Sequence, residues 1–153
     1  MKTFFKPTLL ALFVILCIGK INAQSDESTV LINGNAGALF NDDGRNFSDK
    51  IMLGFEVNYF VKPGIAFTGG LDYLTANNGT TMGVFGTRVY PGSGAFFLRH
   101  RSMINLKSRF NSDFLLGIGY DAMLNDNFAL EFNVDYHFLA QGVGIRAGIG
   151  VFL

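Results

Sequence analysis

The chain ends in the stretch VGIRAGIGVFL, residues Val143–Leu153, in which apolar residues alternate with glycine or polar residues. Successive side chains of a β-strand point to opposite faces of the sheet, so this alternation gives a strand one continuous apolar face. That face is made of Val143, Ile145, Ala147, Ile149, Val151 and Leu153. It requires an apolar neighbour, and for a sheet with nothing left in the chain to cover it we expect that neighbour to be lipid.

Seven further stretches upstream show the same alternation, so the sequence predicts eight strands. The predicted strands are Thr29–Phe40, Ile51–Lys62, one that includes Ile65–Tyr73, Thr81–Tyr90, Ala95–Leu106, one that includes Phe114–Ala122, Phe128–Phe138 and Val143–Leu153. Tight turns at Pro63, Pro91 and Asp126 alternate with more polar loops, as in an up-and-down meander. Strands of about 10 to 12 residues cross a bilayer when tilted. The predicted fold is therefore all-β, an eight-stranded antiparallel up-and-down transmembrane β-barrel.

The N-terminal segment has the pattern of a secretory signal peptide. Lys2 and Lys6 precede ten apolar residues, Leu9–Ile18, and the segment closes at Ala23. A membrane-spanning helix needs about 20 apolar residues, so a retained anchor is disfavoured. We therefore predict a cleaved signal peptide over residues 1–23, a short leader over 24–28 and a barrel domain over 29–153.

Composition after cleavage argues against several classes of partner. The signal peptide removes three of the 12 basic residues and no acidic one, which leaves nine basic residues against 12 acidic ones. No basic patch points to nucleic acid. With two histidines in the whole chain and its only cysteine, Cys17, in the signal peptide, no metal-ligand spacing is present. We expect neither a metal nor a cofactor.

Charged residues lie on the strand faces opposite the apolar ones and would point into the barrel. The predicted lumen charge network is Glu56, Asp72, Arg88, Arg99, Arg101, Asp121, Glu131, Asp135, His137 and Arg146. Isolated buried charges are very costly, so these groups are expected to pair. Hairpin geometry predicts that Arg146 meets Asp135 and His137, and that Arg99 meets Asp121. The three arginines of the fourth and fifth strands would form a basic wall facing acidic residues of the sixth and seventh.

Two interpretations of this lumen stay open. In the first, the salt-bridged polar core fills the barrel, because eight strands leave room for side chains and little else. In the second, the pairs exchange partners and form a narrow gated channel for ions or small solutes. The second interpretation depends on space left by the interior glycines at positions 70, 86, 117, 119, 144, 148 and 150.

The predicted mature chain resembles the small eight-stranded outer-membrane barrels of the OmpA and OmpX kind, and more closely the outer membrane protein β-barrel domain family. The resemblance is most specific in the terminal pattern, where Arg146, Gly148, Val151 and Leu153 occupy the positions of the family's C-terminal assembly signal. The family usually ends in an aromatic residue, most often phenylalanine, whereas this chain ends in Leu153, with Phe152 one place out of register.

This resemblance implies an integral protein of the outer membrane of a Gram-negative cell. It implies contact with outer-membrane lipid, insertion by the barrel-assembly machinery through the C-terminal strand, and a monomer. The implied role is structural or surface-interactive, and not enzymatic.

Two other classes of function are weighed against this one. His100 and Ser102 share the lipid-facing side of the fifth strand and resemble the His-x-Ser of lipid A deacylases, but Met103 stands where that family has asparagine. The neighbouring strands offer no carboxylate to complete a catalytic triad, so we expect no lipid A-modifying activity and place His100 at the membrane interface. A soluble lipocalin-like carrier would have the opposite orientation, with the apolar faces inward around an apolar ligand.

Overall fold

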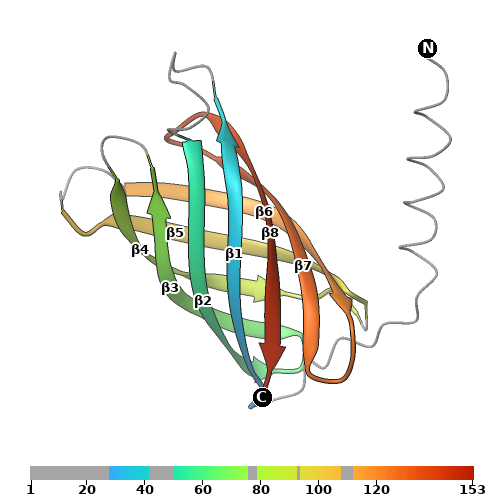
Figure 1. Cartoon of the computed structure of the whole chain (residues 1–153). Helices are drawn as coiled ribbons and strands as arrows, with labels where there is room; N and C mark the ends of the chain where they lie inside the picture. Colours follow the sequence, from blue (N-terminus) through green and yellow to red (C-terminus); the bar gives the residue numbers. More distant parts are fainter. Residues whose placement is uncertain (1–27, 42–49, 76–78, 93, 108–111) are drawn as a thin grey trace, which may run out of the picture.

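The computed structural model describes residues 28–41, 50–75, 79–92, 94–107 and 112–153, so the predicted signal peptide and nearly all of the leader lie outside the described residues. Eight strands form one closed antiparallel barrel in chain order, with the last strand paired to the first (Figure 1). They are β1 (Val30–Phe40), β2 (Ile51–Lys62), β3 (Ile65–Leu74), β4 (Thr80–Val89), β5 (Phe96–Asn105), β6 (Ser112–Met123), β7 (Phe128–His137) and β8 (Gly142–Phe152). The predicted fold class is confirmed. Within the described ranges no helix is long and apolar enough to span a membrane.

The two ends of the barrel differ in their connections. At the turn end, β2–β3, β4–β5 and β6–β7 are joined, and β1 begins and β8 ends there (Figure 1). Gly64 and Gly92 have φ values of 76° and 89° in two of these turns, a region that favours glycine. In the third turn, the side chain of Asn125 accepts hydrogen bonds of 2.9 Å from the backbone N–H groups of Asn127 and Phe128. The opposite end, the loop end, carries the other four connections, which are β1–β2, β3–β4, β5–β6 and β7–β8.

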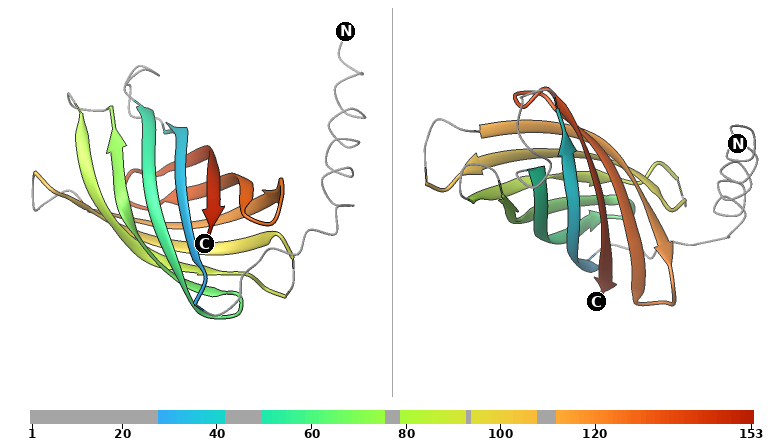
Figure 2. Two further views of the ribbon diagram at one scale, coloured as in Figure 1. Left: turned by 60° about the horizontal axis from the view of Figure 1, so that its bottom comes forward. Right: turned by 45° about the horizontal axis from the view of Figure 1, so that its top comes forward.

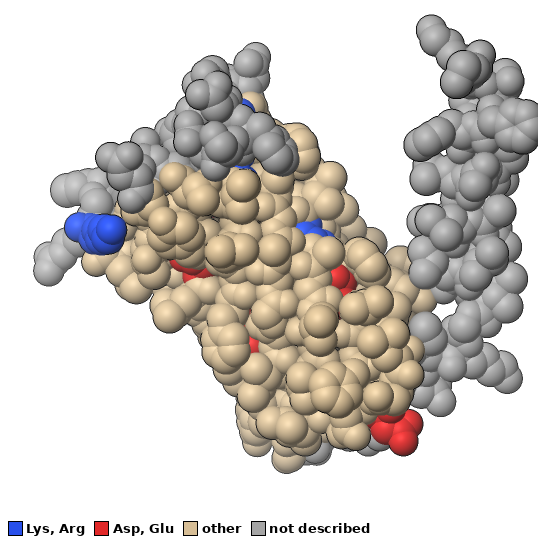
Figure 3. All heavy atoms as spheres, in the orientation of Figure 1, with Lys and Arg blue, Asp and Glu red and all other residues tan. Residues whose placement is uncertain are grey.

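The alternating faces point as predicted, with large apolar side chains outward. Phe55 and Tyr59 of β2, Phe132 and Val134 of β7 and Ile145 of β8 are among the exposed apolar side chains. Figure 3 shows one side of the barrel, whose surface is made almost entirely of uncharged residues. The orientation of a lipocalin-like carrier, with apolar faces inward around a ligand, is therefore wrong for this chain.

The strands are tilted, and their register fixes the height of each residue in the wall (Figure 2). A path from each residue to its paired residue on the next strand can be followed once around the barrel. It starts at the first residue of β1 and ends at the last residue of β1. This path passes through Val30, Tyr59, Phe67, Thr87, His100, Leu116, Tyr136, Val143 and Phe40. It therefore returns to β1 ten residues higher, at 40 instead of 30. Such a stagger is the shear that a closed barrel of tilted strands requires. His100 is reached after four of the eight steps and therefore lies at mid-height.

Candidate functional site in the barrel lumen

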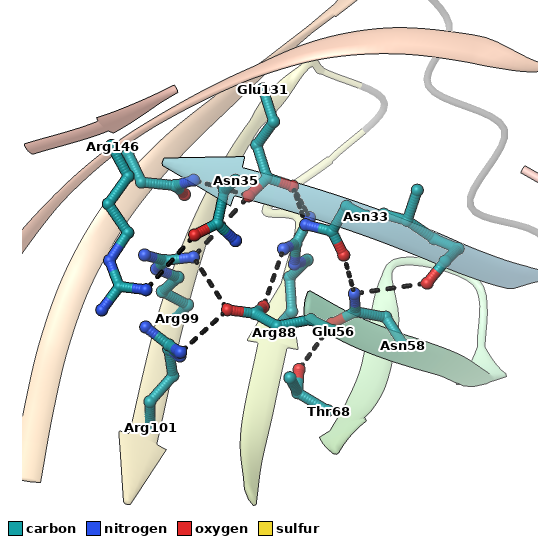
Figure 4. Close-up of polar contacts among 12 residues, drawn as sticks. Asn33, Asn35, Glu56, Asn58, Thr68, Arg88, Arg99, Arg101, Glu131 and Arg146 are labelled. Carbon is teal, nitrogen blue, oxygen red and sulfur yellow. Dashed lines mark hydrogen bonds and ion pairs between the residues drawn. The ribbon is translucent and has the colours of Figure 1, made fainter. Parts of the chain in front are cut away.

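All ten residues of the predicted charge network point into the barrel, and none is more than 4% exposed. They come from seven strands, β2 to β8. They all point inward because in each strand the charged residues lie on the face opposite the apolar one. Nine of them, the four arginines and five carboxylates, form one buried cluster of ion pairs in the middle of the lumen, part of which is shown in Figure 4. Four positive charges and five negative ones leave the cluster close to neutral. Buried charges need partners of opposite sign, because an unpaired buried charge is strongly destabilising.

Arg88 of β4 has three acidic neighbours in the cluster. Its Nη1 lies 2.7 Å from Oε2 of Glu131 and 3.7 Å from Oδ2 of Asp121. Its Nη2 lies 3.7 Å from Oε2 of Glu56. On the turn-end side its guanidinium carbon lies 4.1 Å from the ring centroid of Phe97, a distance at which a cation is attracted to the ring face. Arg88 thus connects the ionic cluster to an apolar one.

Arg99 of β5 binds Asp135 of β7 through two hydrogen bonds, one of them 2.7 Å from Nε to Oδ1 and the other from Nη2 to Oδ2. The predicted partner Asp121 is wrong. The register of β5 and β6 pairs Arg99 with Gly117, and the N–H of Asp121 bonds to the carbonyl of Ala95, four residues away. The hairpin was expected to be centred at residue 109 and is centred at 108. A shift of one residue in the centre moves every cross-strand partner by two.

Arg146 of β8 contacts the predicted Asp135 and, more closely, a residue that sequence reasoning did not pair with it. Its Nε lies 3.8 Å from Oδ2 of Asp135, whereas its Nη1 lies 2.6 Å from Oδ2 of Asp72 on β3. Arg101 shares the same carboxylate at 2.8 Å. This contact spans the lumen and joins strands that are not neighbours, so no hairpin rule could have found it.

His137 does not join Arg146, contrary to prediction. It pairs with Gly142, four residues along β8 from Arg146. Its Nδ1 instead lies 2.8 Å from Oδ2 of Asp113, at the loop end of β6. The other oxygen of Asp113 accepts a 3.0 Å hydrogen bond from the N–H of Leu139. The pair therefore fastens the β7–β8 connection to the start of β6.

Neutral polar side chains that sequence reasoning missed complete the cluster. Asn33 donates a 2.8 Å hydrogen bond to Glu131 and accepts one of 2.9 Å from Asn58, which in turn accepts one of 2.6 Å from Thr68. Figure 4 shows these side chains meeting from β1, β2 and β3. Their inward positions follow from the same alternation that placed the charges. They carry no charge, and charge was the property by which the lumen network was predicted.

An apolar layer closes the lumen at the turn end, although the sequence analysis expected a polar interior. This aromatic layer consists of Leu31, Phe60, Ala66, Tyr90, Phe97, Ala129 and Phe152. The ring centroids of Tyr90 and Phe97 are 5.1 Å apart, and those of Phe60 and Phe152 are 6.5 Å apart. Phe152 is out of register with the lipid-facing residues because it faces inward and belongs to this layer. Each member lies on the inward face of its strand, except Tyr90, which lies just beyond the end of β4. The alternation of the sequence therefore could have predicted that these side chains face inward.

The interior glycines do not leave open space. A Cβ atom at Gly117 would lie 2.0 Å from Oδ1 of Asp135, and one at Gly119 would lie 2.1 Å from Cζ of Phe97. At each of the seven glycines a Cβ would come within 3.0 Å of a neighbouring atom. Neighbouring side chains and backbone atoms already occupy the space beside each glycine. The glycines therefore do not supply the open space that a channel would need.

His100 and Ser102 face outward as predicted, and their side chains meet. Nε2 of His100 lies 3.2 Å from Oγ of Ser102. His100 is paired with Thr87 and Leu116, and Ser102 with phenylalanines of β4 and β6, so none of these cross-strand neighbours is a carboxylate. The register places His100 at mid-height, which corrects the expectation that it lies at the membrane interface.

The residues of the predicted assembly signal have three different environments. Arg146 belongs to the buried cluster, and Gly148 packs against β1, where a Cβ would lie 2.4 Å from the carbonyl of Gly34. Val151 and Leu153 are on the outward face. Recognition of this segment by an assembly machinery stays a prediction.

No group of three or more His, Cys, Asp or Glu side chains that could hold a metal ion occurs in the described part of the chain. The carboxylates of the lumen are instead neutralised by arginine.

Comparison with known proteins gives likeness in fold without likeness in sequence. No family model matches the chain, and no curated protein sequence matches it significantly. Among solved structures, a de novo designed transmembrane β-barrel is similar with a TM-score of 0.66, 15% identity and coverage of 84% of this chain and 98% of that one. The N-terminal β-barrel domain of OprF from Pseudomonas aeruginosa has a TM-score of 0.58, 15% identity and coverage of 83% and 98%. Ail, the attachment invasion locus protein of Yersinia pestis, has a TM-score of 0.53, 14% identity and coverage of 83% and 99%. In its fold the chain is a small eight-stranded barrel of the OmpA and OmpX kind.

Proposed function

We propose that this protein is an integral barrel of the outer membrane of a Gram-negative cell, with a structural or surface-interaction role and a lumen that does not conduct. The outward apolar side chains and the fold shared with transmembrane barrels support the location. The observation that carries the closed lumen is the buried ion-pair cluster together with the aromatic layer below it. The proposed partners are membrane lipid and, through the C-terminal strand, the barrel-assembly machinery.

Conduction would require two unfavourable steps. An ion would first have to separate pairs such as Arg88–Glu131 and Arg146–Asp72, leaving buried charges without partners. It would then have to pass between Phe60, Phe97 and Phe152, which offer no group to replace its water. We therefore assign the function of this barrel to its lipid-facing wall and to its two ends, and not to its lumen.

The proposal includes no catalytic step. Ser102 would need a base activated by a third group, and the residues paired with His100 and Ser102 supply no carboxylate.

Two measurements test this proposal. Fractionation should find the protein in the outer membrane, as a band that migrates faster on a gel before boiling than after it. Reconstitution into planar bilayers should then give no single-channel steps for the wild type. As a matched variant, Phe60→Ala combined with Phe97→Ala removes two of the four aromatic rings of the aromatic layer and should raise conductance. Conductance steps in the wild type would favour the channel, and recovery from the soluble periplasm would overturn the location.

A further inference from the structure

Three of the five methionines in the sequence face inward at the loop end of the barrel. They are Met52 on β2, Met82 on β4 and Met103 on β5, and none of them is more than 8% exposed. Each lies within three residues of the loop end of its strand, as does His137, the last residue of β7. Four side chains with sulfur or nitrogen donors therefore point inward near one end of the lumen.

The side chains of His137 and Met52 approach the same point beside Gly144 of β8. A Cβ at Gly144 would lie 2.8 Å from Nε2 of His137 and 3.2 Å from Cε of Met52. These two distances limit the separation of Nε2 and Cε to 6.0 Å. The two side chains therefore meet inside the barrel, although β7 and β2 are three places apart around it.

The other two methionines are connected to His137 through β6. Met103 is paired with Asp113, whose carboxylate contacts the ring of His137, and it shares an apolar cluster with Met82 and Leu115. Leu115 is in turn paired with His137. An eight-stranded barrel is just wide enough for side chains, and methionine is long, unbranched and adaptable, so methionines from different strands can reach its middle. We call Met52, Met82, Met103 and His137 the methionine–histidine layer.

One buried atom of this layer is available to a ligand. His137 is 3% exposed, and its Nε2 has no hydrogen-bond partner among the described residues. The carboxylate of Asp113 lies 2.8 Å from Nδ1 of His137 and also accepts a hydrogen bond from the N–H of Leu139. Because this carboxylate acts as an acceptor, a neutral His137 carries its hydrogen on Nδ1 and a lone pair on Nε2. Imidazoles that bind metals are commonly oriented by a carboxylate in this way.

The donor set selects the class of ion. Thioether sulfur is a soft ligand that suits Cu(I), and imidazole also binds copper. Calcium and magnesium require oxygen ligands, and zinc sites are built from thiolates, imidazoles and carboxylates instead of thioethers. All four donors are uncharged, so they favour a cation of low charge.

The charges below the layer are compatible with such a cation. The ion-pair cluster contains four arginines and five carboxylates, so one further positive charge brings it to balance. Nη2 of Arg146 donates a 3.5 Å hydrogen bond to Sδ of Met52, which leaves the second lone pair of that sulfur for a metal. The charge of Arg146 is itself matched by Asp72 at 2.6 Å.

We propose that the loop end of this barrel binds one soft monovalent cation, Cu(I) or its analogue Ag(I), through the sulfur atoms of Met52, Met82 and Met103 and Nε2 of His137. This goes beyond the proposed function, since it gives one end of the barrel a ligand of its own, and it does not depend on whether the lumen conducts. The sequence predicted no metal, because these four donors are far apart in the chain and only closure of the barrel brings them together.

Titration of the purified protein with silver nitrate in a chloride-free detergent solution tests this site. Ag(I) is the probe because it needs no reductant, and a Cys17→Ser background removes the only thiol of the sequence. Equilibrium dialysis should find one Ag(I) per barrel, and a large excess of Zn(II) should not displace it. Failure of this protein to bind Ag(I) would overturn the site, and displacement by Zn(II) would overturn its assignment to soft ions.

Matched methionine variants locate the ion. Met52→Leu, Met82→Leu and Met103→Leu conserve volume and should each weaken Ag(I) binding at least tenfold. Met123→Leu is the control, since Met123 packs against the aromatic layer at the turn end, and its affinity should be unchanged. Gel mobility before boiling verifies that each variant barrel is folded. Equal affinities of all four variants would overturn the site.

A further measurement requires no variant at these positions. The methyl carbon resonances of the methionines can be followed by NMR during the Ag(I) titration. Those of Met52, Met82 and Met103 should shift together and saturate at one equivalent, whereas that of Met123 should not move. A shift confined to Met123, or no shift at any methionine, would show that the ion binds elsewhere and would overturn the proposal.

Discussion

Arg88 of β4 donates a 2.7 Å hydrogen bond to Glu131 of β7 across the lumen, and both side chains are at most 1% exposed. The two strands are not neighbours, so the pair holds opposite parts of the wall together. Each partner makes the burial of the other tolerable.

Removal of either member of this pair should destabilise the barrel. We expect Arg88→Met or Glu131→Leu alone to lower the free energy of unfolding by about 3–5 kcal/mol, because each leaves an uncompensated buried charge. The double variant should lose less than the sum, since no charge of this pair is then stranded. Urea unfolding in lipid vesicles measures all three, and strictly additive losses would show that the pair contributes no coupling.

The partner of Arg146 can be identified by double-mutant cycles. We expect the coupling energy between Arg146→Met and Asp72→Asn, within the range of about 0.5–3 kcal/mol usual for contacting residues, to exceed that between Arg146→Met and Asp135→Asn. The reason is that Asp72 lies 2.6 Å from Arg146 and Asp135 lies 3.8 Å away. Equilibrium unfolding of the single and double variants gives both energies. A larger coupling to Asp135 would restore the pairing expected from hairpin geometry.

The depth of outward residues can be tested with two valines. Val134 lies near mid-height on the wall, whereas Val143 is paired with the last residue of β1 at the loop end. Val134→Arg should cost about 2–4 kcal/mol, and Val143→Arg at most about 1 kcal/mol, because a charge near the interface reaches water. Folding yield and urea midpoints in vesicles report both. Equal losses would contradict the heights that the register assigns.

Two glycines test the packing of the wall. Gly119→Ala should be destabilising, since the new Cβ would lie 2.1 Å from the ring of Phe97 in the aromatic layer. Gly69→Ala should be neutral or slightly stabilising, because nothing lies within 4 Å of its Cβ. Thermal or urea unfolding of the two variants makes the comparison. A tolerated alanine at 119 would mean that the aromatic layer has room to rearrange.

The limits of the strands and their two faces were predictable. The predicted range of β2, Ile51–Lys62, is the observed one, and the other strands differ from prediction by one or two residues at their ends. All ten charges of the predicted network are indeed buried inside. These properties follow from alternation with a period of two, which can be recognised from residues that are close together in the chain.

The partners within the lumen were less predictable. Arg99 binds Asp135 instead of Asp121, because the centre of a loop cannot be located to one residue from the sequence. Arg146 meets Asp72 through the lumen, between strands that are far apart in chain order. The aromatic layer went unnoticed for a different reason. Its residues have the predicted inward orientation, but only the closed barrel brings the ends of the strands together at one level.

By itself the sequence determined eight strands, which side of each faces lipid, and which charges are buried, since these depend on residues two apart. The tertiary structure alone decided the ten-residue stagger of the closed barrel. That stagger sets which charges meet across the lumen and places His100 at mid-height instead of at an interface. It could not be read from alternation, because it results from the closure of all eight strands and the packing of the side chains inside them.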